Sequence, residues 1–282
     1  MKYPESNKTT DYLNSDKVQY IGAKNDIVKL AASLIKGTKK TNMEKDFVVE
    51  GIWAHEKIYQ FNLEIEAFLF CPDFIFSSDA EEILVKLLES AKNSYQISKK
   101  VFLKLSDRDG PDGFISICKL PQYSLDDLKL KDNNLLVILD GLEQPGNIGS
   151  IMRTIDGANG DGVIICNRRA RITHPKAIKG SMGASFVIPI IEVEIVALIK
   201  WLVENNFRIF LTDTNADKRY NEADYSGRVA IVAGNERYGI SQPWYEIESE
   251  KISIPMLGSC DSLNVSVATS IVTYEAAIKQ HG

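Results

Sequence analysis

The sequence has few cysteines and histidines, and their spacing excludes the common metal and disulfide sites. The cysteines lie tens of residues apart and form no Cys-x-x-Cys pair: Cys71, Cys118, Cys166 and Cys260. The three histidines are equally scattered, with no His-x-x-x-His pair: His55, His174 and His281. Zinc sites need ligands at close spacing, so we expect no bound metal and interpret the cysteines as reduced thiols of the protein core.

Long apolar segments and nucleotide-binding loops are also missing. No run of about 18 apolar residues occurs, which a membrane-spanning helix would need, and residues 1–16 are polar, without the apolar core of a signal peptide. The chain has no Gly-x-x-x-x-Gly-Lys-Ser/Thr loop. The glycines of residues 157–162 follow an expected helix, whereas a dinucleotide-binding loop follows a strand. We therefore predict a cytoplasmic protein without these nucleotide folds.

Composition and charge are those of an ordinary globular protein. The 282 residues are 44% hydrophobic and 25% charged, and this length favours two compact units. The net charge of −5 argues against nucleic-acid binding, which Lys and Arg drive. Residues 162–191, however, contain no acidic residue and five basic ones: Arg168, Arg169, Arg171, Lys176 and Lys179. Such a run is usually a solvated face, but it is also the pattern of a phosphate-binding patch.

The first half of the chain predicts a small α/β domain. We expect a flexible extension at residues 1–20 and a domain at residues 21–118. Its expected elements are a helix near residues 26–36, strands at residues 47–49, 67–71 and 114–118, and a helix capped by Ser78 and Asp79. Residues 119–134 contain alternating charges and little that could pack, so we predict a linker there.

The second half, residues 135–282, predicts a mostly parallel sheet with helices on both faces. Continuous apolar runs are typical of strands buried on both faces, and they occur at residues 135–139, 163–166, 186–191, 209–211, 229–233 and 252–254. Helical patterns accompany them at residues 148–158, 193–205 and 263–279. The predicted fold class is therefore α/β for both domains.

Polar residues follow three of these expected strands. They are Asn147, a candidate N-cap residue, and Arg153 in the helix after the first strand, Glu236 beside Gly234 after residues 229–233, and Ser262 and Asn264 before the last helix. Each segment alone fits an ordinary structural role: a capped crossover with a surface arginine, a turn with an exposed glutamate, or a helix cap. In open α/β sheets, however, ligands bind beyond the carboxyl ends of strands, which favours a shared site.

Together the segments resemble the three motifs of the SpoU (TrmH-like) family of RNA ribose methyltransferases, within the SPOUT superfamily. In order, they are Asn147-Ile-Gly-Ser-Ile-Met-Arg153, Gly234-Asn-Glu-Arg-Tyr-Gly239 and Ser262-Leu-Asn-Val-Ser-Val-Ala268. The stretch Lys179-Gly-Ser-Met-Gly-Ala184 is also similar to that family. The resemblance covers residues 135–282, while the first half is only loosely similar to the small RNA-recognition domain that many members carry, of a kind related to certain ribosomal proteins.

The resemblance implies methyl transfer from S-adenosylmethionine to a ribose 2′-hydroxyl of structured RNA. Ribosomal RNA is favoured because of the additional first domain. A deep trefoil knot in the C-terminal domain, and a homodimer that shares its active site, are further implications. The alternatives are a non-catalytic RNA-binding or ribosome-assembly protein on the same fold, and a tRNA ribose methyltransferase.

The resemblance also implies roles for individual residues. Carried over by position, the catalytic set is Arg153, Asn147, Glu236, Ser262 and Asn264. The cofactor-binding set is Thr212, Asp213, Gly234, Ile254, Met256 and Leu263. The expected RNA contacts are the five basic residues Arg168, Arg169, Arg171, Lys176 and Lys179. The family more often has arginine at the position of Lys179, and a lysine cannot provide the same bidentate grip on a phosphate.

Arg153 is the residue whose chemistry can be argued from first principles. The usual proposal for the family makes this arginine the base that removes the 2′-hydroxyl proton. A guanidinium is effectively never deprotonated in proteins. We therefore expect Arg153 to stabilise the developing alkoxide and to contact a phosphate, with the proton leaving by another route.

Overall fold

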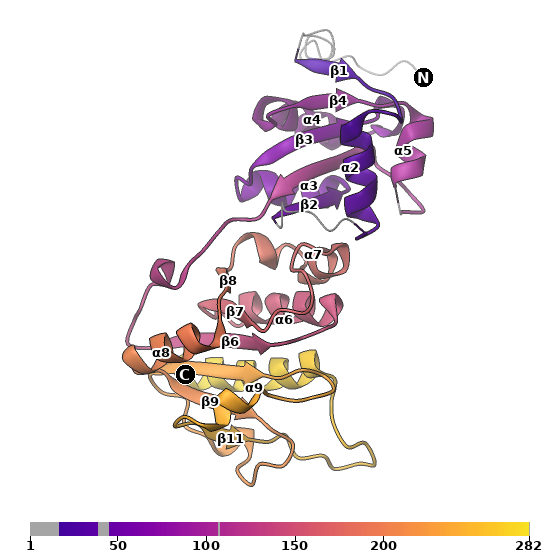
Figure 1. Cartoon of the computed structure of the whole chain (residues 1–282). Helices are drawn as coiled ribbons and strands as arrows, with labels where there is room; N and C mark the ends of the chain where they lie inside the picture. The colour runs from indigo at the N-terminus through magenta and orange to yellow at the C-terminus, as the bar shows by residue number, and fades with distance from the viewer. Residues whose placement is uncertain (1–16, 39–44, 107, 282) are drawn as a thin grey trace. The chain divides into compact units, whose positions relative to one another are not determined.

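A computed structural model describes residues 17–38, 45–106 and 108–281 of the chain. Its contacts divide the chain into two compact units, with the main boundary between Leu120 and Pro121 (Figure 1). Each unit contains a sheet of its own with helices packed against it. The expected linker, residues 119–134, includes the short 3-10 helix η2 (Leu125–Asp127), and Leu128 after it is buried in a core of the second unit.

The N-terminal unit contains a mixed five-stranded sheet in the order β1-β4-β3-β5-β2. Its strands are β1 (Val18–Tyr20), β2 (Asp46–Glu50), β3 (Ile65–Phe70), β4 (Ser94–Gln96) and β5 (Phe114–Lys119). Its helices are α2 (Asp26–Ile35), α3 (Ile52–Gln60), α4 (Ser78–Ser90) and α5 (Lys99–Leu105), with the 3-10 helix η1 (Pro72–Phe74). The sheet is mixed because β5 runs antiparallel to β2 and β3, whereas β4 is parallel to β1 and β3.

The sequence predicted most, but not all, of these elements. The helix near residues 26–36 and the three strands are confirmed as α2, β2, β3 and β5. The cap of α4 is Ser77, whose hydroxyl accepts the Ala80 N–H at 3.2 Å, and not Ser78 or Asp79. Residues 1–16 of the expected extension lie outside the described residues, but its last part is wrong, because Val18–Tyr20 forms β1.

The C-terminal unit contains a six-stranded sheet in the order β11-β9-β10-β6-β7-β8. The strands are β6 (Asn134–Asp140), β7 (Gly162–Cys166), β8 (Ile190–Glu192), β9 (Arg208–Thr212), β10 (Arg228–Ala233) and β11 (Glu250–Ile252). All neighbouring strands pair in parallel, so the predicted parallel sheet is confirmed. Parallel pairing brings the carboxyl ends of these strands to one edge, where their loops meet.

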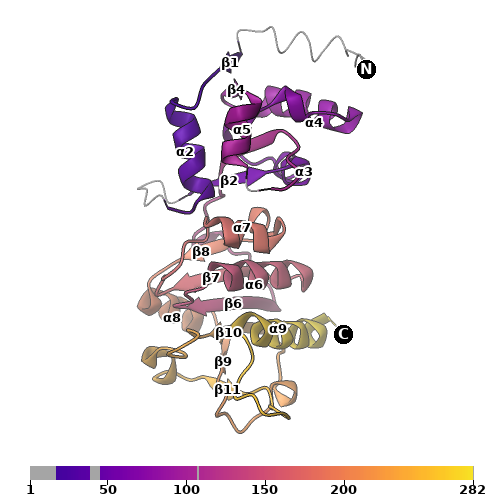
Figure 2. The ribbon, with the colours of Figure 1, turned by 90° about the vertical axis from the view of Figure 1, so that its right-hand side faces the viewer.

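Helices cover both faces of this sheet, as the apolar runs predicted. Leu135, Val137 and Leu139 pack with α6 (Pro145–Gly157) and α9 (Val265–His281), whereas Leu136 and Ile138 pack with α8 (Ile195–Glu204). Figure 2 shows α8 on the side of the sheet opposite α6 and α9. Successive side chains of a strand point to opposite faces, so two apolar cores require the unbroken apolar strands seen in the sequence.

Several expected boundaries in this unit differ from the structure, and the last strand, for example, ends at Ile252 and not at residue 254. Residues 186–191 form no single strand, because the 3-10 helix η3 (Ala184–Phe186) precedes β8, after the short helix α7 (Pro175–Ser181). The helix α6 begins at Pro145, so Asn147 lies in its first turn and is not the N-cap residue. Proline suits the first helical position, since its missing N–H would have had no partner there. The side chain of Asn147 is therefore available for other contacts.

Three of the four cysteines are buried, as the sequence predicted. Cys71, Cys118 and Cys166 are buried, and burial raises the pKa of Cys71 to about 11. Cys260 is exposed, so its interpretation as a core thiol is wrong. Among the described residues, no group of three His, Cys, Asp or Glu could hold a metal ion. Within the same residues, no helix combines the length and apolarity that crossing a membrane requires.

Candidate functional site

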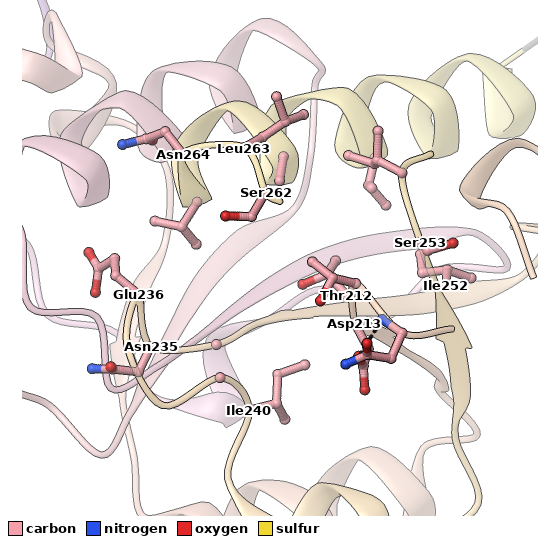
Figure 3. Close-up of a pocket in the computed structure, with 18 of the residues that line it drawn as sticks. Thr212, Asp213, Asn235, Glu236, Ile240, Ile252, Ser253, Ser262, Leu263 and Asn264 are labelled. Atoms are coloured by element: carbon pink, nitrogen blue, oxygen red, sulfur yellow. Dashed lines mark hydrogen bonds between the residues drawn. The ribbon is translucent and has the colours of Figure 1, made fainter. Parts of the chain in front are cut away.

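A cavity lies at the carboxyl ends of three strands of the C-terminal unit. Its volume is about 680 Å³, and its walls come from the loops after β9, β10 and β11 and from the start of α9. Figure 3 shows Ser262, Leu263 and Asn264 on one side of the cavity, across from Thr212, Asp213 and Ile240. This volume is within the range of sites for small molecules and cofactors.

The loop after β10 comes close to its own backbone at Gly234. A Cβ atom at Gly234 would lie 2.4 Å from the carbonyl carbon of Gly239 and from the Ile240 nitrogen. The backbone groups of Asn235 and Gly239 exchange hydrogen bonds of 2.9 and 3.0 Å, and Gly239 has a φ of +72°. Only glycine fits the first position without displacing backbone, and glycine adopts the second conformation at little cost. Both glycines of the motif are thus required by the loop.

A chain of hydrogen bonds joins the three motif segments beside the cavity. The Nδ2 of Asn147 in α6 donates to Glu236 Oε1 at 2.9 Å, and the Nδ2 of Asn264 donates to Asn147 Oδ1 at 3.2 Å. Asn264 Oδ1 in turn accepts the Ser266 N–H at 2.8 Å, which caps the first turn of α9. Residues that are 117 positions apart in sequence are therefore in direct contact.

Glu236 is held as a carboxylate by donors from the loop after β6. Its two oxygens accept the backbone N–H groups of Glu143 at 3.1 Å and Gln144 at 3.3 Å. Desolvation opposes ionisation of this carboxyl, but the hydrogen bonds from Glu143, Asn147 and Gln144 outweigh it and hold the pKa of Glu236 below its ordinary value. An ionised Glu236 accepts from Asn147, which orients the oxygen of Asn147 towards Asn264.

The loop after β9 forms another wall of the cavity. Thr212 donates its hydroxyl hydrogen to the Val232 carbonyl at 2.9 Å, which ties the end of β9 to β10. Asp213 accepts the Asn215 N–H at 2.9 Å and the Tyr245 hydroxyl at 3.1 Å. Burial, together with the nearby Asp213 carboxylate, raises the pKa of Tyr245 to about 12. The Asp213 carboxylate is thus fixed in place at the rim, where it can accept hydrogen bonds from a ligand.

The structure brings most of the expected site residues to this cavity. All six residues expected to contact a cofactor line it: Thr212, Asp213, Gly234, Ile254, Met256 and Leu263. Of the expected catalytic set, Glu236, Ser262 and Asn264 line it, and Asn147 is hydrogen-bonded to Glu236. Arg153 does not line the cavity. Its side chain is exposed on α6, next to Thr154, whose hydroxyl contacts the Ser270 hydroxyl of α9 at 2.7 Å.

Part of the basic run from Arg168 to Lys179 is engaged in ion pairs with acidic side chains. Arg168 forms an ion pair with Glu192 at 3.1 Å, and Arg169 forms one with Glu143 at 3.0 Å. Lys176 and Lys179 are exposed on α7, and Arg171 is half-buried. The patch therefore consists of two parts, one at the edge of the cavity around Arg169 and one on α7.

Two residues of the site were missed by sequence reasoning. Asn235 is buried and donates to the Gly141 carbonyl at 2.7 Å, which joins the loops after β6 and β10. Asp140 is 2% exposed and accepts the N–H and hydroxyl of Ser241 at 2.7 and 2.6 Å. The signal was present for both, since each is a polar side chain within two residues of an apolar run, but their partners are distant in sequence.

Comparison with known families identifies two segments of the chain. The profile of the SpoU rRNA Methylase family matches residues 134–274, which include every strand of the parallel sheet. The profile of the MRM3-like substrate binding domain matches residues 25–116, in the N-terminal unit.

Individual relatives and one solved structure agree with these matches. The chain is 26% identical over 201 residues to the 23S rRNA (guanosine(2553)-2′-O)-methyltransferase RlmP of Bacillus subtilis (strain 168), covering 69% of this chain and 79% of the relative. It is 38% identical over 208 residues to a Staphylococcus aureus (strain COL) protein assigned to the TrmH family of tRNA/rRNA methyltransferases, covering 70% and 83%. The crystal structure of an AdoMet-bound rRNA methyltransferase from Sinorhizobium meliloti superposes with a TM-score of 0.82 at 25% identity, covering 92% of this chain and 97% of that one.

Proposed function

This chain belongs to the SpoU family of rRNA methylases, and on that basis we propose that it transfers a methyl group from S-adenosylmethionine to a ribose 2′-hydroxyl of ribosomal RNA. The observation that carries the proposal is the hydrogen-bonded chain Glu236–Asn147–Asn264, which gathers the three motifs beside one cavity. Relatives named as rRNA 2′-O-methyltransferases, RlmP among them, support the reaction class.

The cavity fits S-adenosylmethionine in size and chemistry. Apolar side chains such as Ile240, Ile252 and Leu263 can contact an adenine ring, and Asp213 offers a carboxylate to polar groups of the ligand. Gly234 keeps the β10 loop free of a side chain at the wall. We propose that S-adenosylmethionine is held by Thr212, Asp213, Gly234, Ile254, Met256 and Leu263. When bound, this cofactor supplies an electrophilic methyl on a sulfonium.

The protein's own residues would align the attacking ribose and stabilise its charge. The amides of Asn147 and Asn264, fixed by the Glu236 carboxylate, can orient polar groups of the substrate at the cavity edge. Ser262 at the same edge offers a further hydroxyl. Arg153 would stabilise the developing alkoxide by a charge-assisted hydrogen bond. Alignment and charge stabilisation are the contributions that a methyl transfer of this kind requires from the protein.

The position of Arg153 suggests that the protein acts as a homodimer. In one chain it is exposed on α6, outside the cavity, so the site is incomplete without a second copy. Beside α6, helix α9 presents an apolar stripe to solvent: Val267 is 47%, Tyr274 44% and Ile278 65% exposed. Burial of such a stripe against a second copy would be favourable, and would carry Arg153 of one protomer towards the cavity of its partner.

Mixed dimers test this arrangement. Arg153→Ala and Gly234→Ala variants, each inactive alone, would be unfolded together and refolded as a mixture. If Arg153 acts on the partner's cavity, half of the dimers contain one intact site, and about a quarter of wild-type activity returns. Activity that stays at the level of the separate variants would show that each protomer completes its own site.

A knot in the C-terminal unit is the remaining fold-level proposal. The last helix, α9, follows the edge strand β11 but packs on α6 near the centre of the sheet. Its preceding segment lines the cavity together with the loops after β9 and β10. We propose that this segment is threaded through those loops as a deep trefoil knot, a rare exception among folds. Such threading would keep the cavity walls together.

The N-terminal half of the chain supports ribosomal RNA as the substrate. We assign RNA recognition to residues 21–118, supported by the match of residues 25–116 to a substrate binding domain. The basic residues of α7, Lys176 and Lys179, together with Arg168, Arg169 and Arg171, would add phosphate contacts. A tRNA substrate is the second candidate, because the S. aureus relative is assigned to a family of tRNA/rRNA methyltransferases.

Methyl transfer to RNA tests the proposal directly. The full-length protein would be incubated with labelled S-adenosylmethionine and with rRNA or tRNA from a strain that lacks it. We expect label in rRNA and, after digestion, in a 2′-O-methylnucleoside. Label in tRNA alone would favour the second candidate. Label on a base, or RNA binding without label, would overturn the proposed reaction.

A further inference from the structure

The loop after β10 displays an aromatic side chain at the mouth of the cavity. Tyr238 lines the cavity, yet 70% of it is exposed. This ring lies two residues after Glu236 in the same loop. The contacts of the proposed site do not involve its side chain.

A closed set of contacts holds Tyr238 in place. The guanidinium carbon of Arg169 lies 5.5 Å from the centroid of the Tyr238 ring, and Arg169 is ion-paired with Glu143 at 3.0 Å. Glu143 Oε1 also accepts from Asn235 Nδ2 at 3.3 Å, and Asn235 Oδ1 accepts the Tyr238 N–H at 3.0 Å. The contacts therefore return to the residue where they began. Asn235 is the buried member of this set, so the exposed ring is anchored to the core.

We propose that Tyr238 and Arg169 form a stacking platform for a nucleobase of the RNA substrate, at or next to the methylated nucleotide. Proteins read unpaired RNA bases by stacking them on aromatic rings and arginine planes, and an ordered ring binds with a smaller loss of side-chain entropy. The Glu236–Asn147–Asn264 chain, where the ribose is to be placed, lies on the same loop and the adjoining helix starts. The inference rests on the proposed RNA methylation and adds the group that positions the base.

Steady-state kinetics with rRNA from the deletion strain provide the first test. Loss of one stacked base in Tyr238→Ala should raise the KM for RNA about tenfold, with little change in the affinity for S-adenosylmethionine measured by calorimetry. Tyr238→Phe and Tyr238→Trp keep a ring and should remain close to wild type. Val196→Ala, at a 74% exposed position on α8, is the control for surface truncation. An unchanged KM in Tyr238→Ala, or a loss of S-adenosylmethionine affinity, would overturn the platform.

Competition between two oligonucleotides separates base stacking from phosphate contact. Decauridylate and an abasic ribose-phosphate decamer carry the same backbone charge, and each would be added as an inhibitor of rRNA methylation. The wild type should be inhibited more strongly by decauridylate, and Tyr238→Ala should lose this preference while Tyr238→Trp retains it. Equal inhibition of the wild type by both would refute stacking. Failure of the wild type to methylate any RNA would instead refute the proposed function on which the inference rests.

Discussion

The two units differ in the surroundings of particular polar side chains. In the N-terminal unit, His55 is fully buried, with Nδ1 2.7 Å from the Gly51 carbonyl and Nε2 2.9 Å from the Ser116 hydroxyl. A carbonyl can only accept, so Nδ1 donates, and the neutral ring accepts the Ser116 hydroxyl at Nε2. In the C-terminal unit, Glu236 and Asn264 are exposed at a cavity, with hydrogen-bonding capacity left over for a ligand.

The cavity of the C-terminal unit follows from its sheet topology. All six strands of this sheet are parallel, so the loops after β9, β10 and β11 gather at one edge and enclose a cavity. Among the described strands of the N-terminal unit, β1, β2, β3 and β4 share one direction and β5 runs against its neighbours. Strand direction alone therefore does not distinguish the two units. The difference lies in the side chains: His55 is hydrogen-bonded within the core, whereas Glu236 and Asn264 keep hydrogen-bonding capacity at the cavity.

The largest effect is expected from Arg153, a member of the proposed catalytic set that is exposed on α6. Arg153→Ala should lower kcat about a thousandfold, as removal of one stabilising donor does in other enzymes, because the alkoxide loses its charged partner. Calorimetry should find S-adenosylmethionine binding intact, since Arg153 does not line the cavity of its own chain. Lost binding in a normally folded variant would contradict the separation of catalytic and cofactor contacts.

The next largest effect is expected from Gly234→Ala, on the binding of S-adenosylmethionine. In Gly234→Ala the new Cβ would lie 2.4 Å from backbone atoms of the same loop, which must then move away from the cavity wall. The affinity for S-adenosylmethionine should fall more than about a hundredfold, corresponding to about 3 kcal/mol, as measured by calorimetry. Gly258→Ala is the matched control, because no atom lies within 4 Å of its added Cβ. Equal affinities of the two variants would show that the close packing of the β10 loop at Gly234 does not shape the cofactor site.

The pH dependence of stability tests the structural role of His55 in the N-terminal unit. Burial lowers its pKa from 6.5 to about 4. Because the unfolded chain binds the proton first, the stabilisation is complete above pH 6.5 and is lost as the pH falls towards 4. At about 1.4 kcal/mol per pKa unit, the loss is about 3 kcal/mol. Urea unfolding of the N-terminal unit at pH 7 and 5 should show about 2 kcal/mol of this loss, and His55→Gln should lack this step. The same pH dependence in both proteins would mean that His55 is not held neutral.

Asn147 should produce the smallest effect, because it acts through its neighbours. Asn147→Ala removes the link between Glu236 and Asn264 and should lower kcat/KM about tenfold, or about 1.4 kcal/mol. The double variant Asn147→Ala/Asn264→Ala should then be little worse than the poorer single variant, because the residues work as one unit. Additive losses in this cycle would show that the two amides act independently.

Sequence reasoning succeeded where a pattern has a single physical cause. The runs at residues 135–139 and 229–233 are strands because both faces of β6 and β10 are buried. It failed for β1 and β4, which are three residues long and depend on partners, as in the pairing of Ser94 with Val18 and Phe68. No local pattern marks such a strand, because its hydrogen bonds come from elsewhere in the chain.

The sequence by itself determined which residue types meet at the site: a glycine that lets the β10 loop fold closely, and polar side chains after buried strands. Only the tertiary structure decided that Asn147 is no helix cap but joins Glu236 to Asn264, that Tyr238 is clamped by Arg169, and that Arg153 lies outside its own cavity. The reason is that backbone requirements are local and can be recognised from neighbouring residues. Hydrogen-bond partners 89 and 117 positions apart are selected by strand order, which the sequence pattern does not contain.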